Sequence, residues 1–517
     1  MTWIVLGEEN GKIKLVSKSA SSDERPGILP KGSFLTIEDN EAECKFILRV
    51  DESNQFEPYK PSPLVIDMDL SGLYADTKCQ NIIHAYRVKN ISNRIDGKID
   101  FILPQSIARR SNQGEIDLAF GSVEKGPRIF LSTVHGGQNQ LLVDEKLNYI
   151  TSMLPEDMFY HQMQICGKTG SGKTVAMKYL AQYFVEKMNG AVLAINVKDV
   201  DFLKMDQPSK AFNEETGKEW SMLGETPRGI QNCVIYYPAN TKIEAFRGIN
   251  YEIAQKITLD VNTIEPEALT GLLQHISEVG AQNFPDIFRY WQQKDKKKTK
   301  CFNQFVSYFQ EAQKEYVFKT LNLRGDVSDI TLHSATYDNI LRNLNAALEF
   351  FDNSDAKSLD YDDILSNGKM SIINVAGSRG IQFGSILLRH LLKRVVEAKS
   401  QQISAVPILV IIDEVHQFYN TESSMEALGD LDTICRTGRS QKIGVVFASQ
   451  NPSDLPKGLS SVINSKIFFR SDDTGSKFGI SAEEIQTMMP GYAVVNIHNI
   501  PQLRTIKFPV SFSGVIN

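Results

Sequence analysis

The 517-residue sequence predicts an α/β protein that combines a predominantly parallel, doubly wound sheet with a β-rich N-terminal domain and a helical insertion. Three patterns support this prediction. Short β-type runs fill the N-terminal region, a glycine-rich loop then stands between an apolar strand and a helix, and apolar strands alternate with helices towards the C-terminus. We therefore expect a β-rich domain at 1–145, an α/β core at 146–241 and 354–517, and a helical lobe at 242–353.

The N-terminal region is expected to form a small β-barrel or sandwich. Its apolar runs are short and are separated by turn residues, which is typical of strands joined by tight connections. The runs are TWIVLG, KIKLVS, CKFILRV, PLVIDMDL, IDFILP, PRIFLS and NQLLVD.

The glycine-rich loop fits the pattern G-x-x-x-x-G-K-[ST] of a phosphate-binding P-loop. In such a loop the backbone amides surround phosphate oxygens, the lysine reaches the terminal phosphates and the hydroxyl binds magnesium. The strand QMQICG precedes the loop and the helical pattern TVAMKYLAQYFVEKM follows it, so phosphate would lie at a helix N-terminus. The predicted nucleotide-binding residues are Gly167, Lys168, Thr169, Gly170, Ser171, Gly172, Lys173 and Thr174.

The rest of the chain predicts the remaining strands and the lobe. AVLAINV is an apolar strand, and helical patterns then dominate between Lys242 and Asn353, notably EPEALTGLLQHISEVG and YDNILRNLNAALEFF. The sheet resumes with MSIINVAG and continues through PILVIIDE, IGVVFASQ, SKIFFRS and YAVVNIH. The helix QFGSILLRHLLKRVVEAKS and a second helix separate the earlier of these strands. This alternation favours parallel pairing.

An acidic pair ends the apolar run ILVIIDE. Asp413 and Glu414 stand at the C-terminal end of a buried strand, where open α/β sheets bind ligands. Asp413, with Thr174, is predicted to bind Mg2+, and Glu414 is predicted to activate the attacking water. Two acids can also follow a strand simply because the chain reaches solvent there, but the preceding P-loop favours the functional interpretation.

A third polar position follows the strand IGVVFAS. The amide of Gln450 could sense the γ-phosphate of a nucleotide or orient a water molecule. A polar residue at a strand end does not by itself indicate function. A functional role for Gln450 is favoured because the residue follows the P-loop and the acidic pair in the sequence.

Composition limits the functional classes. The net charge of −6 provides no global cationic field, so contact with nucleic acid would need local patches or a ring of subunits. The run KDKKKTK, from Lys294 to Lys300, is one such patch, although runs of this kind are more often solvated loops. The six scattered cysteines predict reduced thiols, and no apolar run reaches the length of a membrane span. We therefore expect a soluble, cytoplasmic protein with no membrane contact.

Four segments together resemble the HerA/FtsK group of ring-forming P-loop ATPases, and HerA most closely. They are the P-loop, VIIDEVH, CRTGRSQKIGVVFASQNPSDL and NSKIFFRSDD, in this order, and the similarity covers about residues 145–517. The resemblance implies a RecA-like core preceded by a HerA-type barrel, with ATP and Mg2+ as cofactors. It also implies a homo-hexamer that threads double-stranded DNA.

The resemblance also assigns roles to matching residues. Lys173 is similar to the phosphate-binding lysine, Gln450 to the polar sensor, and Arg439, in RTGRS, to a catalytic arginine that acts across the subunit interface. A guanidinium from a neighbour would neutralise charge that develops during phosphoryl transfer. Arg436 and Arg470 are alternatives, and a structural ion pair is the other explanation for each arginine.

Two segments depart from the family, and the first is the glycine and lysine spacing of GRSQKIG, which is looser than in the family and bears on the assignment of Arg439. The second is INVKDVDFL, where many HerA-like chains carry an acidic Asp-x-x-Gly-Glu type segment after the second strand of the core. Lys198, Asp199 and Asp201 are therefore left without a predicted role.

Two hypotheses of function follow. The first is a hexameric Mg-ATPase that translocates on double-stranded DNA and works with a separate effector in antiphage defence, such as a NurA-type or other nuclease or a sirtuin-like NADase. The second is an ATP-dependent assembly scaffold that organises an effector without productive translocation, which the acidic net charge favours. A small-molecule kinase fits less well, because the chain offers both a water-activating glutamate and a sensor strand.

Overall fold

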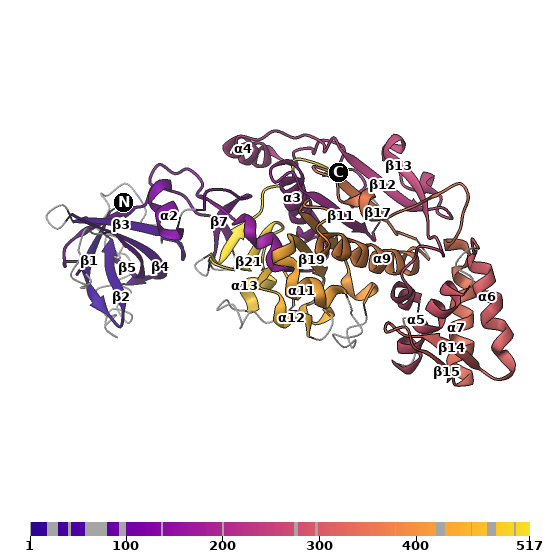
Figure 1. Cartoon of the computed structure of the whole chain (residues 1–517). Helices are drawn as coiled ribbons and strands as arrows, with labels where there is room; N and C mark the ends of the chain where they lie inside the picture. Colours follow the sequence, from indigo (N-terminus) through magenta and orange to yellow (C-terminus); the bar gives the residue numbers. More distant parts are fainter. Residues whose placement is uncertain are drawn as a thin grey trace, which may run out of the picture. The chain divides into compact units, whose positions relative to one another are not determined.

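The computed structural model describes residues 2–17, 29–39, 43–56, 80–91, 100–121, 123–135, 138–198, 201–272, 278–294, 298–377, 379–419, 430–455, 458–472, 482–500 and 503–516. Contacts within the chain divide it into two compact units. The first unit comprises 1–156, 474–495 and 499–508, and the second comprises 157–473, 496–498 and 509–517. Figure 1 shows a barrel near the N-terminus and a large sheet covered by helices, which belong to the first and second unit respectively.

A closed six-stranded barrel begins the first unit. Its strands are β1 (Trp3–Glu9), β2 (Lys12–Ser17), β3 (Phe34–Asp39), β4 (Cys44–Phe56), β5 (Gln80–Ile91) and β6 (Ile107–Arg110). They pair in the order β1-β2-β5-β4-β3-β6, and β6 closes the barrel on β1. Alternate residues such as Ile13 and Leu15 of β2 point into the apolar core, as the sequence pattern predicts.

The barrel prediction is confirmed, with one wrong strand. Residues 100–104 of the run IDFILP form no strand. Phe101 and Leu103 are exposed, and Ile102 between them is buried, so residues 100–104 form a loop that anchors Ile102 in the barrel core. The run PLVIDMDL lies outside the described residues.

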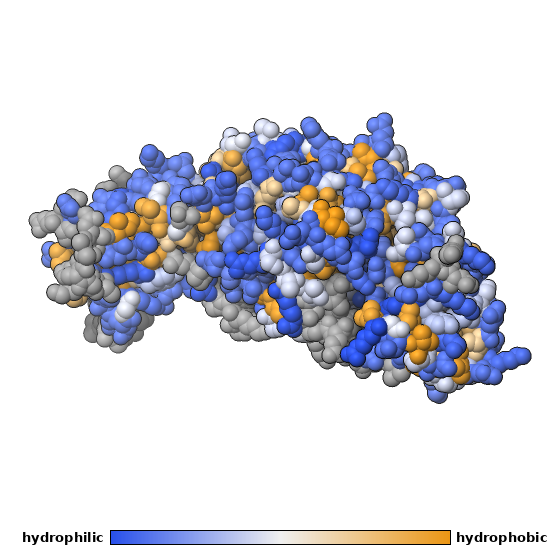
Figure 2. All heavy atoms as spheres, in the orientation of Figure 1, coloured by the Kyte–Doolittle hydropathy of each residue, from blue (hydrophilic) through white to orange (hydrophobic). Residues whose placement is uncertain are grey.

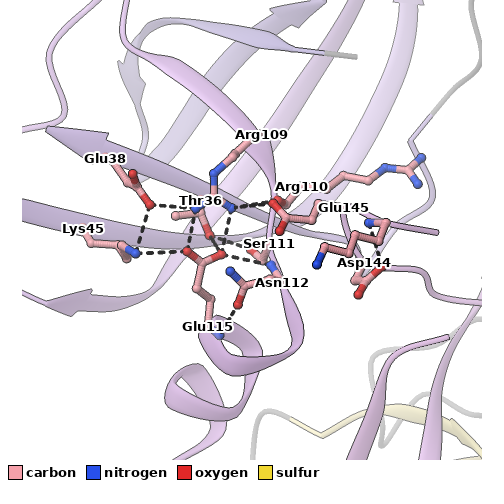
Figure 3. Close-up of polar contacts among 11 residues, drawn as sticks. Thr36, Glu38, Lys45, Arg109, Arg110, Ser111, Asn112, Glu115, Asp144 and Glu145 are labelled. Carbon is pink, nitrogen blue, oxygen red and sulfur yellow. Dashed lines mark hydrogen bonds and ion pairs between the residues drawn. The ribbon is translucent and has the colours of Figure 1, made fainter. Parts of the chain in front are cut away.

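A short helix, α2 (Gln113–Phe120), follows the barrel and carries a buried acid. The Glu115 carboxylate accepts hydrogen bonds at both oxygens: Oε1 from Lys45 and Arg109, and Oε2 from Thr36, Arg109 and the backbone amide of Asn112. Figure 3 shows these side chains converging on Glu115 from strands β3, β4 and β6. Because Asn112 is also the N-cap of α2, this cluster fixes the helix against the barrel wall.

The remaining strands of the first unit form a smaller antiparallel group. β7 (Arg128–His135) pairs with β8 (Gln138–Leu141), with β9 (Thr151–Met153) and with β22 (Thr505–Lys507), and β22 also pairs with β21 (Tyr492–Asn496). Helix α13 (Ala482–Gln486) contributes Ile485 to a small core with Val134 and Val494.

The second unit is built on a sheet in which the nine strands described here pair in parallel. They are β10 (Met163–Cys166), β11 (Ala191–Asn196), β12 (Cys233–Pro238), β13 (Ala254–Thr258), β16 (Lys357–Ser358), β17 (Met370–Asn374), β18 (Ile408–Ile412), β19 (Ile443–Ser449) and β20 (Ser465–Phe468). Their order is β16-β13-β12-β17-β11-β18-β19-β10-β20. This confirms the parallel RecA-like core. Strands β11, β17 and β18 are buried along their whole length, which explains their continuous apolar sequences.

Helices connect these strands. They are α3 (Lys173–Glu186), α4 (Glu214–Leu223), α8 (Tyr361–Ile364), α9 (Gly380–Ser400), α11 (Asp430–Gln441) and α12 (Leu459–Val462). Short 3-10 helices lie at Glu156–His161, Ile243–Ala245, Tyr251–Ile253, Pro266–Leu272, Ala312–Lys314, Leu348–Phe350, Val415–Gln417 and Pro452–Asp454. The predicted helix after the P-loop and the predicted helix at 382–400 are both present.

The helical lobe contains α5 (Glu278–Gln293), α6 (Phe302–Glu311), α7 (Ser334–Ala347) and a hairpin of β14 (Val317–Leu321) and β15 (Val327–Thr331). Its aromatic residues, including Phe284, Phe305 and Tyr337, belong to the same apolar core as the strands of the sheet. The expected helix at EPEALTGLLQHISEVG is wrong in its first part, because Pro266–Leu272 is a 3-10 helix.

The domain limits expected from the sequence stay a prediction. The contacts place the first division after residue 156 and join part of the C-terminal region to the first unit. The expected lobe, 242–353, contains β13, β14 and β15 as well as helices. Figure 2 shows that the drawn face of the described residues is mostly hydrophilic, with apolar residues in small groups.

Candidate nucleotide site

The carboxyl ends of four neighbouring strands meet at one edge of the parallel sheet. In the order β11-β18-β19-β10, these strands lead into Lys198, the Asp413–Glu414 pair, Gln450 and the P-loop. Cys166 at the end of β10 is in register with Ser449 at the end of β19. The sheet therefore gathers every predicted site residue except the arginine at the edge where α/β folds bind ligands.

Glycines shape the P-loop. Gly167, Gly170 and Gly172 have φ angles of 157°, 75° and 100°, which side chains with a Cβ rarely adopt. A Cβ on Gly167 would also lie 2.7 Å from Cβ of Phe469 and 2.8 Å from Oγ of Ser171. The loop ends at Gly172, which caps the N-terminus of α3, so the first amides of this helix face the loop.

Lys173 is held inside the loop. Its Nζ donates hydrogen bonds to the carbonyl oxygens of Gly167, at 2.6 Å, and Ser449, at 3.0 Å. Burial lowers the pKa of Lys173, and the negative charges of Asp413 and Glu414 act in the opposite direction. The ammonium group is therefore placed between the loop and the acidic pair, as a phosphate-binding lysine requires.

The other P-loop residues differ in exposure. Lys168, Thr169 and Gly170 are exposed, and Nζ of Lys168 pairs with Asp472 at 2.6 Å. The Ser171 hydroxyl is buried and makes no hydrogen bond to the described residues. An unsatisfied buried hydroxyl within a P-loop is a feature that a phosphate oxygen would complete.

Asp413 lies directly after β18 and is 5% exposed. Its Oδ1 accepts a hydrogen bond from the amide of Glu414 at 2.9 Å. Burial raises the pKa of Asp413, and the adjacent charge of Glu414 raises it further. This carboxylate would become more favourable beside a cation, because a positive charge would offset the cost of burial.

Glu414 is 1% exposed and has left-handed backbone angles, φ 47° and ψ 53°. Its Oε1 accepts hydrogen bonds from Nζ of Lys198 and, at 3.1 Å, from Nε2 of Gln450. Its Oε2 accepts no hydrogen bond within the described part of the chain, and Nδ1 of His416 lies 3.7 Å away. One oxygen is thus held in place while the other has free lone pairs.

The charge of Glu414 is retained despite its burial. Burial raises the pKa of Glu414, but the hydrogen bonds from Lys198 and Gln450 and the charges of Lys198 and Lys173 together lower it below the ordinary value. The residue is therefore an ionised carboxylate near neutral pH, which is the state that a general base needs.

Lys198 is the functional candidate that sequence reasoning missed. It lies two residues beyond β11, which is the direct neighbour of β18, so adjacent strand ends bring it to Glu414. Its position after an apolar strand was visible in the sequence, but its pairing with Glu414 was not, because that pairing depends on the strand order. Asp199 lies outside the described residues.

Arg439 lies at the opposite edge of the sheet. It stands in the last turn of α11, which leads into the first residue of β19, whereas the P-loop side is reached only at the end of β19. Arg436, one turn earlier, is exposed, and the carbonyl oxygen of Arg470 accepts a hydrogen bond from the amide of Lys168 at 2.8 Å. Arg439 is therefore not placed to reach the P-loop of its own chain.

The basic run is only partly described. Nζ of Lys300 donates hydrogen bonds to the carbonyl oxygens of Trp291 and Gln292 and lies 4.9 Å from the centre of the Trp291 ring. This lysine therefore caps the C-terminal end of α5. Residues 295–297 lie outside the described part of the chain.

The residues present fit a magnesium nucleotide. The amides of the loop, Lys173 and the unsatisfied Ser171 hydroxyl suit phosphate, while Thr174 and Asp413 offer the hydroxyl and carboxylate oxygens that Mg2+ prefers. In the described ranges no group of three or more His, Cys, Asp or Glu residues could hold a metal ion. One carboxylate and one hydroxyl are enough for Mg2+ in a nucleotide site, because the phosphates of the nucleotide and water molecules supply its other ligands.

A comparison with known sequence families gives one match. Residues 152–395 match the family described as "Helicase HerA, central domain". This segment begins just before the P-loop strand and ends within α9, so it contains the P-loop and Lys198. No protein with a curated description matches the chain.

Solved structures provide distant likenesses. The bacterial conjugative coupling protein TrwBdeltaN70 is 13% identical, with a TM-score of 0.46 over 77% of this chain and 97% of that chain. VirB4 of Thermoanaerobacter pseudethanolicus is 10% identical, with a TM-score of 0.45 over 75% and 97%. The genome packaging NTPase B204 from Sulfolobus turreted icosahedral virus 2 is 9% identical, with a TM-score of 0.27 over 67% and 96%.

Two further observations concern the setting of the site. Within the described ranges, no helix is both long and apolar enough for a membrane crossing. Cys44, Cys166, Cys233, Cys301 and Cys435 are free thiols. The cytoplasmic setting stays a prediction.

Proposed function

We propose that this chain hydrolyses ATP with Mg2+ and uses this energy to translocate on double-stranded DNA, because it combines a P-loop with a match to the central domain of helicase HerA. The observation that carries the hydrolytic part is the geometry of Glu414. The buried, ionised carboxylate of Glu414 lies near the P-loop Lys173. Its Oε1 accepts hydrogen bonds from Lys198 and Gln450, and its Oε2 is free to accept a proton.

The residues divide the work of hydrolysis. The P-loop amides and Lys173 bind and orient the phosphates, and Glu414 accepts a proton from the attacking water at Oε2. Gln450 donates a hydrogen bond to Oε1 of Glu414, and we propose that it responds to the state of the γ-phosphate. Thr174 and Asp413 would hold Mg2+, which supplies charge stabilisation at the transferred phosphoryl group.

The catalytic arginine is proposed to come from a neighbouring subunit. Arg439 is exposed and lies at the far edge of its own sheet, which supports a role in a neighbour's site within a homo-hexamer. A guanidinium donated in this way would make hydrolysis depend on assembly.

Mixed assemblies test this arrangement. Arg439→Ala and Glu414→Gln subunits should each be inactive alone, and their mixture should recover activity, because some interfaces then combine an intact Glu414 with an intact Arg439. The same mixing with Glu414→Gln is repeated for Arg436→Ala and Arg470→Ala. If ATP hydrolysis is not recovered with Arg439→Ala but is recovered with one of these two variants, the catalytic role belongs to that arginine. ATP hydrolysis and the size of each assembly are measured together.

Translocation on DNA is the finer part of the proposal. Its support is the match to a family described as a helicase. Its test is steady-state ATP hydrolysis by the size-verified oligomer, with and without long linear duplex DNA, at two salt concentrations. Duplex DNA should strongly stimulate ATP hydrolysis by a motor. The stimulation should be weaker at high salt, because DNA contacts release counterions.

An assembly scaffold is the second candidate function. The net charge of −6 and the use of Lys300 as a helix cap reduce the cationic surface available to DNA, which favours this alternative. Hydrolysis that is indifferent to DNA would support it. In either case we propose a separate effector, either a nuclease or a sirtuin-like NADase, and an antiphage role, to be sought by co-purification with the oligomer.

A further inference from the structure

The site contains a lysine whose contact is not explained by phosphate binding. Lys198 follows β11, outside the P-loop, and its Nζ pairs with Oε1 of Glu414. Its side chain is 43% exposed, whereas that of Glu414 is 1% exposed, so a flexible cation reaches from the surface to a buried anion.

We propose that Lys198 is a positioning residue for Glu414, holding Oε1 so that Oε2 faces the attacking water. The proposal rests on the hydrolytic function proposed above and adds a residue to it. Lys198 and Gln450 approach the same oxygen from the ends of β11 and β19, the two strands that flank β18, and the other oxygen is left without a hydrogen bond in the described residues. Two donors on one oxygen restrict rotation of the carboxylate more than one donor can.

The charge of Lys198 has a second consequence. A buried carboxylate without a counter-charge is costly, and Gln450 supplies only a neutral amide. Lys173 is nearby, but its hydrogen bonds go to the carbonyl oxygens of Gly167 and Ser449. Among the described residues, Lys198 is therefore the cation that makes a direct hydrogen bond to Glu414, and its loss should leave the carboxylate both less ordered and less stable.

The kinetic test uses three variants. Lys198→Ala should lower kcat for ATP about tenfold and leave KM within about twofold, because positioning of the base affects the chemical step more than nucleotide binding. Lys198→Arg should recover much of the loss. Lys242→Ala, at an exposed lysine, is the matched control and should behave as the wild-type chain.

The second test needs no turnover. A double-mutant cycle combines Lys198→Ala with Glu414→Gln and follows the melting temperature without nucleotide. Lys198→Ala should lower the melting temperature by about 2 °C or more in the wild-type background and have little effect once Glu414 is neutral.

Several results would overturn the proposal. A higher KM at unchanged kcat would mean that Lys198 binds nucleotide instead, and a higher kcat would mean that it restrains the base. Equal melting shifts in both Glu414 backgrounds would show that the ion pair is not formed. If the wild-type oligomer hydrolyses no ATP, the proposed function fails, while the melting cycle still decides whether Lys198 acts on Glu414.

Discussion

Two buried glutamates, one in each compact unit, show how similar side chains are used differently. Glu115 in the barrel is 4% exposed and Glu414 in the core is 1% exposed. Glu115 accepts five hydrogen bonds shared between both oxygens, including two from Arg109. Glu414 accepts two, both at Oε1. The first carboxylate is saturated, and the second keeps one oxygen available.

The environments of the two acids explain their different capacities. Burial raises the pKa of Glu115, but Arg109, the amide of Asn112, Thr36 and Lys45 together lower it to about 2. Such a carboxylate has no free lone pair and little tendency to accept a proton at neutral pH. Saturation therefore favours a structural role, and an unsaturated oxygen beside a phosphate-binding loop favours a chemical one.

The largest expected effect separates the two roles. Glu414→Gln should retain ATP binding and lower turnover by about 10³-fold, because an amide cannot accept the proton of the attacking water. Phosphate release and binding of a fluorescent nucleotide measure the two properties. Glu115→Gln is the control and should keep normal turnover at temperatures where it is folded. Normal turnover in Glu414→Gln would remove Glu414 from the proposed mechanism.

The reverse effect is expected on stability. Glu115→Gln should lower the free energy of unfolding at pH 7 by about 3 kcal/mol, because Arg109 and Lys45 lose the buried one of the two anions that they share and keep only the more exposed Glu38. Denaturant unfolding of the full chain, followed by a signal from the first unit, measures this loss. Glu414→Gln should cost less, because neutralising Glu414 also removes the cost of a buried, half-satisfied charge. A larger loss for Glu414→Gln would contradict the comparison.

The stabilisation by Glu115 should also depend on pH. Its folded pKa of about 2 lies below the ordinary value of 4.5, so its contribution is present above pH 4.5 and is lost as the pH falls towards 2. The shift corresponds to about 3 kcal/mol at neutral pH. The difference between wild type and Glu115→Gln should therefore shrink between pH 4.5 and 2. If the difference in unfolding free energy between wild type and Glu115→Gln stayed constant over this pH range, the charge of Glu115 would not be the source of the stabilisation.

The sequence predicted the core better than it predicted the contacts within it. Local patterns were sufficient for the P-loop, the acidic pair and the parallel strands, because each depends on neighbours in the chain. Lys198 could not be assigned in this way, since its partner is 216 positions away and the pairing depends on the strand order β11-β18. The order of strands in a sheet is set by packing across the whole unit.

The barrel shows the same division. Alternation in KIKLVS predicted β2 with its correct limits, but residues 100–104 of the run IDFILP form no strand. Glu115 stands three residues after the N-cap Asn112, which is a local pattern, but its contacts with Thr36, Lys45 and Arg109 carried no sequence signal, because these residues come from β3, β4 and β6. The role proposed for Arg439 is different again, because it depends on the proposed assembly with other subunits.

The smallest expected effect tests whether saturation makes single donors dispensable. Lys45→Met should lower the free energy of unfolding by only about 0.5 kcal/mol, because Lys45 is partly exposed and Glu115 keeps four other hydrogen bonds. Denaturant unfolding beside Glu115→Gln measures the difference. A loss as large as that of Glu115→Gln would mean that the cluster depends on every donor, and Glu115 and Glu414 would then differ in location rather than in how securely they are held. A small loss of unfolding free energy in Lys45→Met, together with a tenfold fall in kcat for Lys198→Ala, would support the comparison. Removing one hydrogen-bond donor would then matter for Glu414, which has two donors, and not for Glu115, which keeps four other hydrogen bonds.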